Sequence, residues 1–97
     1  MEYINLLIKL RSPIGRLVDG LIVVRDEFAL AKFSDPNLAQ QLYDADKKDG
    51  LDVFYSEERN TYIQRYKGKG KDEIITIISK ELEKSGGKII TKDEAKE

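Results

Sequence analysis

Cysteine and histidine are both absent from the 97 residues, and each absence excludes classes of chemistry. A chain without cysteine has no disulfide scaffold, no thiolate nucleophile, no zinc site with cysteine ligands and no iron–sulfur cluster. A chain without histidine has no imidazole base, no Ser-His-Asp triad and no zinc or non-haem iron site built on histidine. Catalysis would rest on carboxylates, lysines, tyrosines and hydroxyls. We therefore predict a protein that is not an enzyme and that uses no cofactor and no metal.

Long apolar runs are also missing. The apolar stretches are short, as at residues 21–24, and fall far below the roughly 20 residues of a membrane-spanning helix. The N-terminus is acidic at Glu2 and shows no small-residue cleavage site, so we predict no signal peptide, no membrane contact and a cytoplasmic location. Charged residues make up 36% of a cysteine-free chain that is rich in lysine and isoleucine, which is typical of proteins from hot environments.

The apolar content suits one small domain. Apolar residues make up 40% of the 97 residues, which is enough to form a single hydrophobic core. We predict one domain over residues 1–91, followed by a charged tail over residues 92–97 that is frayed.

Alternation of apolar residues predicts three strands in the first third of the chain. Residues 3–10 place isoleucine or leucine at every second position, which is the pattern of a strand. A Ser-Pro-Ile-Gly turn follows, and then residues 17–25, which are apolar on both faces and so predict a central strand. Gly20 within it indicates a bulge or a close approach of the backbone. A third strand is predicted over residues 28–33, and a short helix over residues 13–19 is the alternative.

The first helix is predicted to begin at Pro36, which suits the first helical position, with Ser34 or Asp35 as the N-cap. Gly50 would end it, because glycine tolerates the left-handed conformation that follows a helix. Its apolar face is formed by residues at spacings of four and three, namely Leu38, Leu42 and Ala45.

Two more strands and a second helix follow. The strands are predicted over residues 51–56 and 61–67, joined by a polar turn. Asp72 and Glu73 lie where the positive end of the second helix is expected, and lysines lie near its negative end. A Ser-Gly-Gly sequence ends this helix, and residues 88–91 predict a short edge strand. The apolar stripe of the helix consists of Ile74, Ile77, Ile78 and Leu82.

These elements predict an α+β fold. The order is βββ-α-ββ-α-β, a mainly antiparallel sheet of five to six strands with two helices packed on one face. The second face of the strand over residues 17–25 is apolar as well, and one chain has little left to cover it. We therefore predict that the chain forms a homodimer.

Charge is spread unevenly, although the net charge is only −1. Residues 59–71 contain five basic residues and no acid, and they end in a Gly-Lys-Gly-Lys loop before a helix N-terminus. Free amides, flexible glycines and lysines favour an anion, and tyrosine rings on the adjoining strand would stack on unpaired bases. The alternative is a solvated hairpin whose lysines oppose edge-to-edge pairing. The candidate anion or nucleic-acid site consists of Arg59, Tyr62, Arg65, Tyr66, Lys67, Lys69 and Lys71.

The hairpin, the Gly-Lys-Gly-Lys loop and the helix after it together resemble the end of a double-stranded RNA-binding domain. That resemblance implies that lysines at the helix N-terminus meet phosphates. It covers about twenty residues, and Asp72 and Glu73 stand where that family carries more positive charge, so the chain is not assigned to the family.

Residues 35–58 are acidic, with seven acids against two lysines. The spacing does not fit a calcium-binding loop counted from Asp44, because Lys48 and Tyr55 fall where ligands are required. An acidic face of this kind can mimic nucleic acid towards a basic protein. The candidate partner-binding residues are Asp44, Asp46, Asp49 and Asp52.

The sequence as a whole predicts a small non-enzymatic binding or regulatory module that acts through surface contacts with a protein partner. Accessory and inhibitor proteins of viruses and mobile elements are often of this kind. The alternative is binding of a nucleic acid or nucleotide phosphate through residues 59–71. The acidic sequence pI of 5.6 argues against that alternative.

Overall fold

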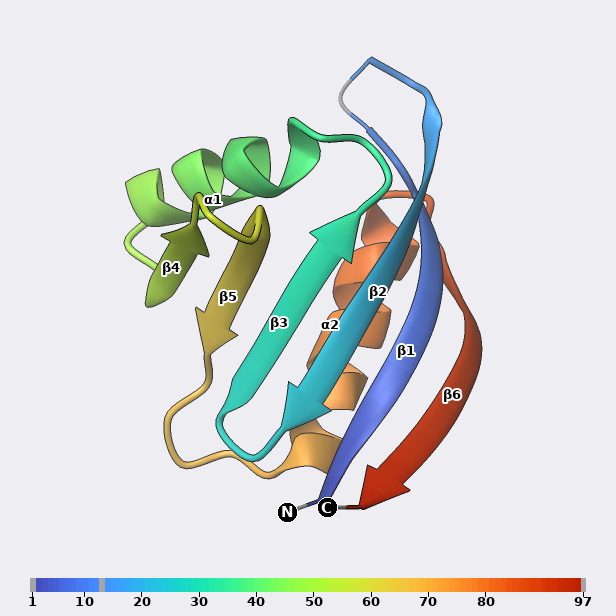
Figure 1. Cartoon of the computed structure of the whole chain (residues 1–97), viewed down its shortest axis with the longest axis vertical. Coiled ribbons are helices and arrows are strands. Elements are labelled where there is room, and N and C mark those ends of the chain that lie inside the picture. Colours follow the sequence, from blue (N-terminus) through green and yellow to red (C-terminus); the bar gives the residue numbers. More distant parts are fainter. Residues whose placement is uncertain (1, 13, 97) are drawn as a thin grey trace.

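The computed structural model describes residues 2–12 and 14–96, and for residues 2 and 93–96 it describes the backbone only (Figure 1). One six-stranded sheet has the order β4-β5-β3-β2-β1-β6, and every neighbouring pair is antiparallel. The α+β fold and the antiparallel sheet with two helices are as the sequence predicts. The elements are β1 (Glu2–Arg11), β2 (Leu17–Arg25), β3 (Phe28–Phe33), α1 (Leu38–Lys48), β4 (Val53–Ser56), β5 (Thr61–Arg65), α2 (Lys71–Lys84) and β6 (Lys88–Lys96).

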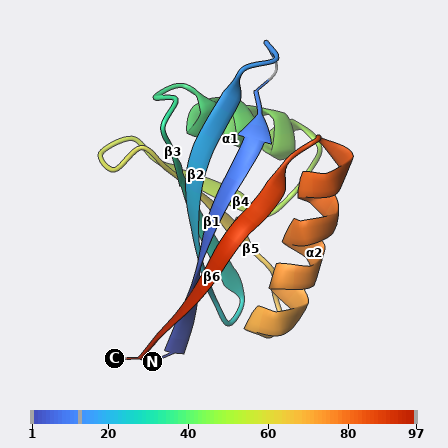
Figure 2. The same cartoon turned by 90° about the vertical axis from the view of Figure 1, so that its right-hand side faces the viewer.

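Both helices pack on the same face of the sheet and build the core there. Helix α1 lies over β3, β4 and β5, whereas α2 lies over β1, β2, β3 and β6 (Figures 1 and 2). Strand alternation supplies the sheet side of this core, because every second residue of β1 is buried, as predicted. The buried apolar side chains of β1 and β2 are Ile4, Leu6, Ile8, Leu10, Val18, Ile22 and Val24.

Gly20 allows two strands to pack side chains over its backbone. A Cβ atom at this position would lie 2.9 Å from Cδ1 of Phe33 and 3.0 Å from Cγ1 of Ile8. The ladders from β2 to β1 and to β3 both run through Gly20 without a register shift, so the glycine marks close packing and not a bulge.

Helix α1 begins two residues later than predicted. Its N-cap is Asn37, whose side chain makes no capping bond, and a carboxylate oxygen of Asp35 accepts a hydrogen bond from the backbone N–H of Asn37 at 2.9 Å. Asp35 thus shapes the turn before the helix instead of capping the helix. The predicted apolar face is also wrong at Ala45, which is exposed, whereas Ala39 is fully buried beside Leu38.

Helix α2 agrees more closely with the prediction. It buries Ile74, Ile78 and Leu82 of the predicted stripe together with Ile75, while Ile77 is half-buried. The helix ends before Gly86, whose φ of +80° is in the left-handed region that favours glycine.

The last strand is longer than the sequence predicts. The segment over residues 92–97 was predicted to be a frayed tail, but β6 continues to Lys96, and Glu2 pairs with Lys96 in the ladder with β1. Residues 88–91 alone would leave the first half of β1 as an unpaired edge, and the longer strand covers it. A register shift at Leu7 and Ile8 accommodates the added residue.

The other boundaries differ by a few residues. Strands β4 and β5 are shorter than the predicted ranges of 51–56 and 61–67, and β5 ends at Arg65. Just beyond it, the backbone N–H of Tyr66 donates to the carbonyl of Glu27 in the β2–β3 turn at 2.7 Å. The predicted turn includes Pro13, which lies outside the described residues. No helix forms over residues 14–19, where β2 begins at Leu17. Among residues 2–12 and 14–96, no helix is long and apolar enough to cross a membrane.

Candidate functional site

The sheet face without helices presents an apolar band. Figure 2 shows both helices on the opposite side of the sheet. Strand register places four apolar residues next to one another across β4, β5, β3 and β2, namely Phe54, Ile63, Leu30 and Val23. In a neighbouring row, Leu7 of β1 lies beside Leu21 of β2. Leu7 and Phe54 are exposed, with exposed fractions of 42% and 46%, and Leu21 is exposed as well. The other three side chains, those of Val23, Leu30 and Ile63, are half-buried. We call this surface the open face.

Charged residues surround the apolar band. Next to the β1–β2 loop, Nζ of Lys9 on β1 lies 3.7 Å from a carboxylate oxygen of Asp19 on β2. At the end of β5, Nε of Arg65 lies 3.9 Å from a carboxylate oxygen of Asp52, which directly precedes β4. The open face therefore has an apolar centre and a rim that carries both signs of charge, which is the anatomy of a protein–protein interface. Two further basic side chains on the same strand faces are Arg25 and Lys32.

A second feature is a groove of about 410 Å³ on the helix-covered face. It lies between α1 and α2, because the two helices pack over different halves of the sheet. Its floor includes Ile22, Ala31 and Tyr62 from the central strands. Its other apolar lining residues are Ile8, Leu10, Phe33, Leu42, Leu51, Ile77, Ile78 and Leu82.

Polar groups converge on this groove. The hydroxyl of Tyr62 donates a hydrogen bond to a carboxylate oxygen of Asp46 on α1. Burial, and then the bond and the charge of Asp46, raise the pKa of Tyr62 far above its usual range. Burial also raises the pKa of Tyr66 to about 12, and the negative charges of Asp46 and Glu81 add to the effect. Gln64 and Ser85 complete the polar lining.

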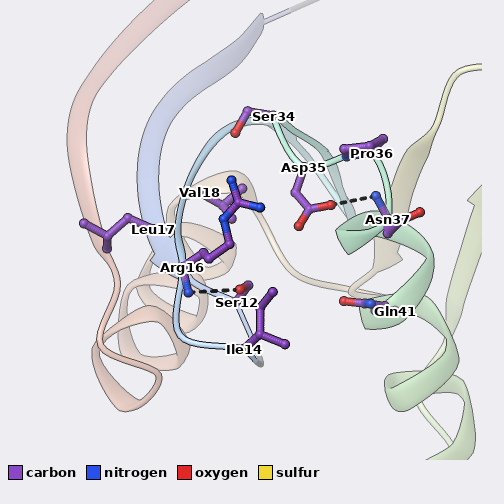
Figure 3. A pocket seen from close by; sticks show the side chains of 10 residues that line it. All are labelled: Ser12, Ile14, Arg16, Leu17, Val18, Ser34, Asp35, Pro36, Asn37 and Gln41. Atoms are coloured by element: carbon purple, nitrogen blue, oxygen red, sulfur yellow. Dashed lines mark hydrogen bonds between the residues drawn. The ribbon is translucent and has the colours of Figure 1, made fainter.

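The third feature is a hollow of about 440 Å³ between the β1–β2 loop and the loop before α1. Figure 3 shows the side chains of Arg16 and Asp35 extending into the same space. The backbone N–H of Arg16 donates to Oγ of Ser12 at 3.3 Å, which ties the β1–β2 loop together. The lining carries one positive and one negative side chain, so its charge favours no particular ligand.

The structure separates the tyrosines of the predicted anion site from its basic residues. Alternation along β5 holds as predicted, but the tyrosines lie under the helices. The prediction that Tyr62 stacks on a base is wrong, because only 3% of the residue is exposed and its hydroxyl is bonded to Asp46. Tyr66 is half-buried in the same groove, whereas Arg65 lies on the open face.

The Gly-Lys-Gly-Lys loop already has an anion from its own chain. The backbone N–H of Lys71, at the start of α2, donates to a carboxylate oxygen of Asp26 at 3.1 Å. Lys69 pairs with Glu73 at 3.9 Å, and its carbonyl accepts the N–H of Glu27 at 3.0 Å. The loop is thereby fastened to the β2–β3 turn. Arg59 is exposed in the β4–β5 turn and Lys67 is exposed next to the loop, whereas Tyr62 lines the groove and Arg65 lies on the open face. The predicted residues are therefore divided between surfaces.

The predicted acidic residues are also dispersed. Asp44 and Asp49 are exposed on α1 and at its C-terminal cap. Asp46 turns towards the groove, and Asp52 pairs with Arg65. Within the described residues, no group of three or more acidic side chains is arranged to hold a metal ion.

The sequence pattern indicates only some of the apolar residues of the open face. The two-sided apolar pattern of residues 17–25 indicated an uncovered face, and residues 28–33 carry the same signal at Leu30. Nothing local indicates that Phe54 and Ile63 extend the band, because that depends on how β5 pairs with β3. No local sequence pattern predicts the groove, because its residues come from different elements. Asp46 and Tyr62, for example, are 16 residues apart.

Comparisons with known proteins do not assign the chain to a family: no family model, no curated protein and no solved structure matches it.

Proposed function

We propose that this chain is a small non-enzymatic binding module that works as a homodimer, with the open faces of two copies packed against each other. The observation that carries the proposal is the apolar row formed by Phe54, Ile63, Leu30 and Val23, which crosses four strands without a covering layer. An α+β domain normally buries an apolar sheet face against a second layer. A second copy supplies that layer with the same surface.

The size of the open face agrees with such a dimer. Six strands spaced about 4.8 Å apart, with about 3.3 Å per residue and lengths from 4 residues in β4 to 10 in β1, give a projected area of roughly 600 Å². Side-chain relief brings the accessible surface close to the ~800 Å² that each partner buries in a standard interface.

The rim also suits self-association. It presents carboxylates at Asp19 and Asp52 and basic groups at Lys9, Arg25 and Arg65. In a two-fold dimer the same surface of each copy faces the other. A rim with both positive and negative side chains therefore allows ion pairs between the two copies. A basic patch alone would instead oppose a second copy.

The alternative function, nucleic-acid or phosphate binding through residues 59–71, has less support. Within that segment Tyr62 is buried and Tyr66 is half-buried. Stacking on unpaired bases requires accessible aromatic rings.

The absence of cysteine and histidine supports a non-enzymatic role. A further protein partner, in the manner of an accessory or inhibitor protein of a virus or mobile element, remains a prediction from the sequence. The same holds for a cytoplasmic location and an origin in a hot environment.

Sedimentation equilibrium tests the proposal. We expect the wild type to sediment with twice the chain mass, and Leu7→Glu to sediment as a folded monomer, because the substitution places a charge in the apolar band. Ile14→Glu is the matched control, since Ile14 is 77% exposed and lies in the loop after β1, away from the band. A wild type that stays monomeric at millimolar concentration, or a Leu7→Glu variant that remains dimeric, would contradict the proposal.

A titration of labelled single- and double-stranded RNA and DNA, at about 50 and 200 mM salt, tests the alternative. Binding that weakens steeply with salt, and that is lost in a Lys67→Ala and Lys69→Ala double variant, would favour nucleic-acid binding instead.

A further inference from the structure

We propose that the groove between α1 and α2 binds a small apolar molecule with a cationic amine head, whose ammonium group lies between the carboxylates of Asp46 and Glu81. The proposal does not rest on the homodimer, because the groove and the open face lie on opposite sides of the sheet.

The groove has the size and lining of a ligand site. Its volume of about 410 Å³ lies within the range of 300 to 1,000 Å³ that is usual for small-molecule pockets. Isoleucine and leucine side chains from both helices and the sheet provide most of the lining, and Ala31 leaves room at the floor. Polar groups are few, and one of them, the hydroxyl of Tyr62, is bonded to Asp46; a small number of placed polar groups is what fixes the orientation of a ligand.

The charge of the lining selects the ligand class. Asp46 on α1 and Glu81 on α2 are the charged residues among those that line the groove, and both are negative. Among the residues that the structure describes, no basic side chain lines the groove to compensate them. An anionic ligand would be repelled, and a neutral ligand would leave both carboxylates without a counter-charge.

Both carboxylates line the same groove, and so does Tyr66, whose pKa the negative charges of Asp46 and Glu81 help to raise. Within the described residues, neither carboxylate takes part in an ion pair, and Asp46 accepts its hydrogen bond from the uncharged hydroxyl of Tyr62. An ammonium group in this region would therefore be the first cation to meet either carboxylate.

Aromatic rings reinforce the same preference. Tyr62, Tyr66 and Phe33 all line the groove, and the face of an aromatic ring attracts a cation within about 6 Å. The apolar part of the ligand would then lie against Ile22 and Leu82.

Isothermal titration calorimetry with octylammonium as the probe tests the proposal, with octanol and octanoate as probes of the same chain length. We expect octylammonium to bind more tightly than octanol, and octanoate to bind least. Amide chemical shifts in two-dimensional NMR should change around Ala31 and Leu42 and not on the open face, which distinguishes the groove from adsorption to the apolar band.

Single substitutions identify the carboxylates. Glu81→Gln and Asp46→Asn keep the size and hydrogen-bonding oxygen of each side chain, and each should weaken octylammonium binding about threefold to tenfold. Glu83→Gln and Asp44→Asn are the matched controls, since both residues are exposed on the same helices and do not line the groove. These controls should leave the affinity unchanged.

Three outcomes would overturn the proposal. One is octanol binding as tightly as octylammonium, which would reduce the groove to an apolar cavity. Another is equal weakening by Glu83→Gln and Glu81→Gln, which would indicate general attraction to an acidic surface. The third is an absence of shift changes in the groove at millimolar octylammonium.

Discussion

At the scale of single residues, Tyr62 and Tyr66 show how tertiary packing sets the chemistry of a side chain. Tyr62 in β5 and Tyr66 just beyond its end lie on one side of the sheet, as the sequence predicts. That side faces the helices, so Tyr62 bonds to Asp46 and Tyr66 lies half-buried near Glu81. Both phenols are held in the neutral form, because a buried phenolate beside carboxylates would be costly.

The raised pKa of Tyr66 predicts that the folded chain loses stability at alkaline pH. Its pKa is about 12 in the folded chain, against 10.0 as its ordinary value. Below pH 10 both states keep the proton. Above it the unfolded state ionises first and is favoured, so the free energy of unfolding falls as the pH rises from 10 towards 12. Urea unfolding across this range should show a shallower fall in Tyr66→Phe than in the wild type, and equal slopes would contradict the assignment.

At the scale of elements, the start of α2 depends on a residue far away in the sequence. Asp26, in the β2–β3 turn, accepts the N–H of Lys71, and Glu27 in the same turn bonds to the loop before the helix. Gly70, the N-cap residue of α2, has no side chain to cap the helix. A carboxylate 45 residues away therefore takes the place of a local cap.

Removing this carboxylate should destabilise the fold. We expect Asp26→Ala to lower the free energy of unfolding by about 1 kcal/mol, the usual value of an N-terminal cap. Asp26→Asn should cost less, since its amide oxygen still accepts the hydrogen bond. The comparison is Glu58→Ala, an exposed acid in another turn. Urea unfolding that gives Asp26→Ala and Glu58→Ala the same stability would show that the contact contributes nothing.

At the scale of the whole molecule, two helices cover one face of a sheet that is apolar on both. The helix-covered face holds the core, and the open face holds the band from Phe54 to Leu7. A chain of this size has no third layer, so the open face is where a second copy would add the most buried surface.

The proposed dimer predicts a thermal stability that depends on protein concentration. Mass action stabilises a folded state that associates, so the Tm of the wild type should rise over a hundredfold increase in concentration. The Tm of Leu7→Glu should stay constant, because the monomer gains nothing from added protein. Calorimetry that finds the same constant Tm in both proteins would argue against association through this face.

Local patterns in the sequence determined the fold class and most of the elements. Period-two alternation identified the buried side of β1, and the apolar stripe identified α2, because both depend on residues within one element. The apolar residues on both sides of β2 also indicated an uncovered face. The absence of cysteine and histidine limited the chemistry before any fold was known.

Only the tertiary structure decided which side each feature faces and which distant residues meet. The pairing of β5 with β3 extends the apolar band, and the pairing of β6 with β1 turns an expected tail into a strand. The packing of α1 over β5 brings Asp46 to Tyr62 and separates the tyrosines from the basic residues beside them. Strand partners and helix positions are set by contacts across the whole chain, and periodicity within one segment does not encode them.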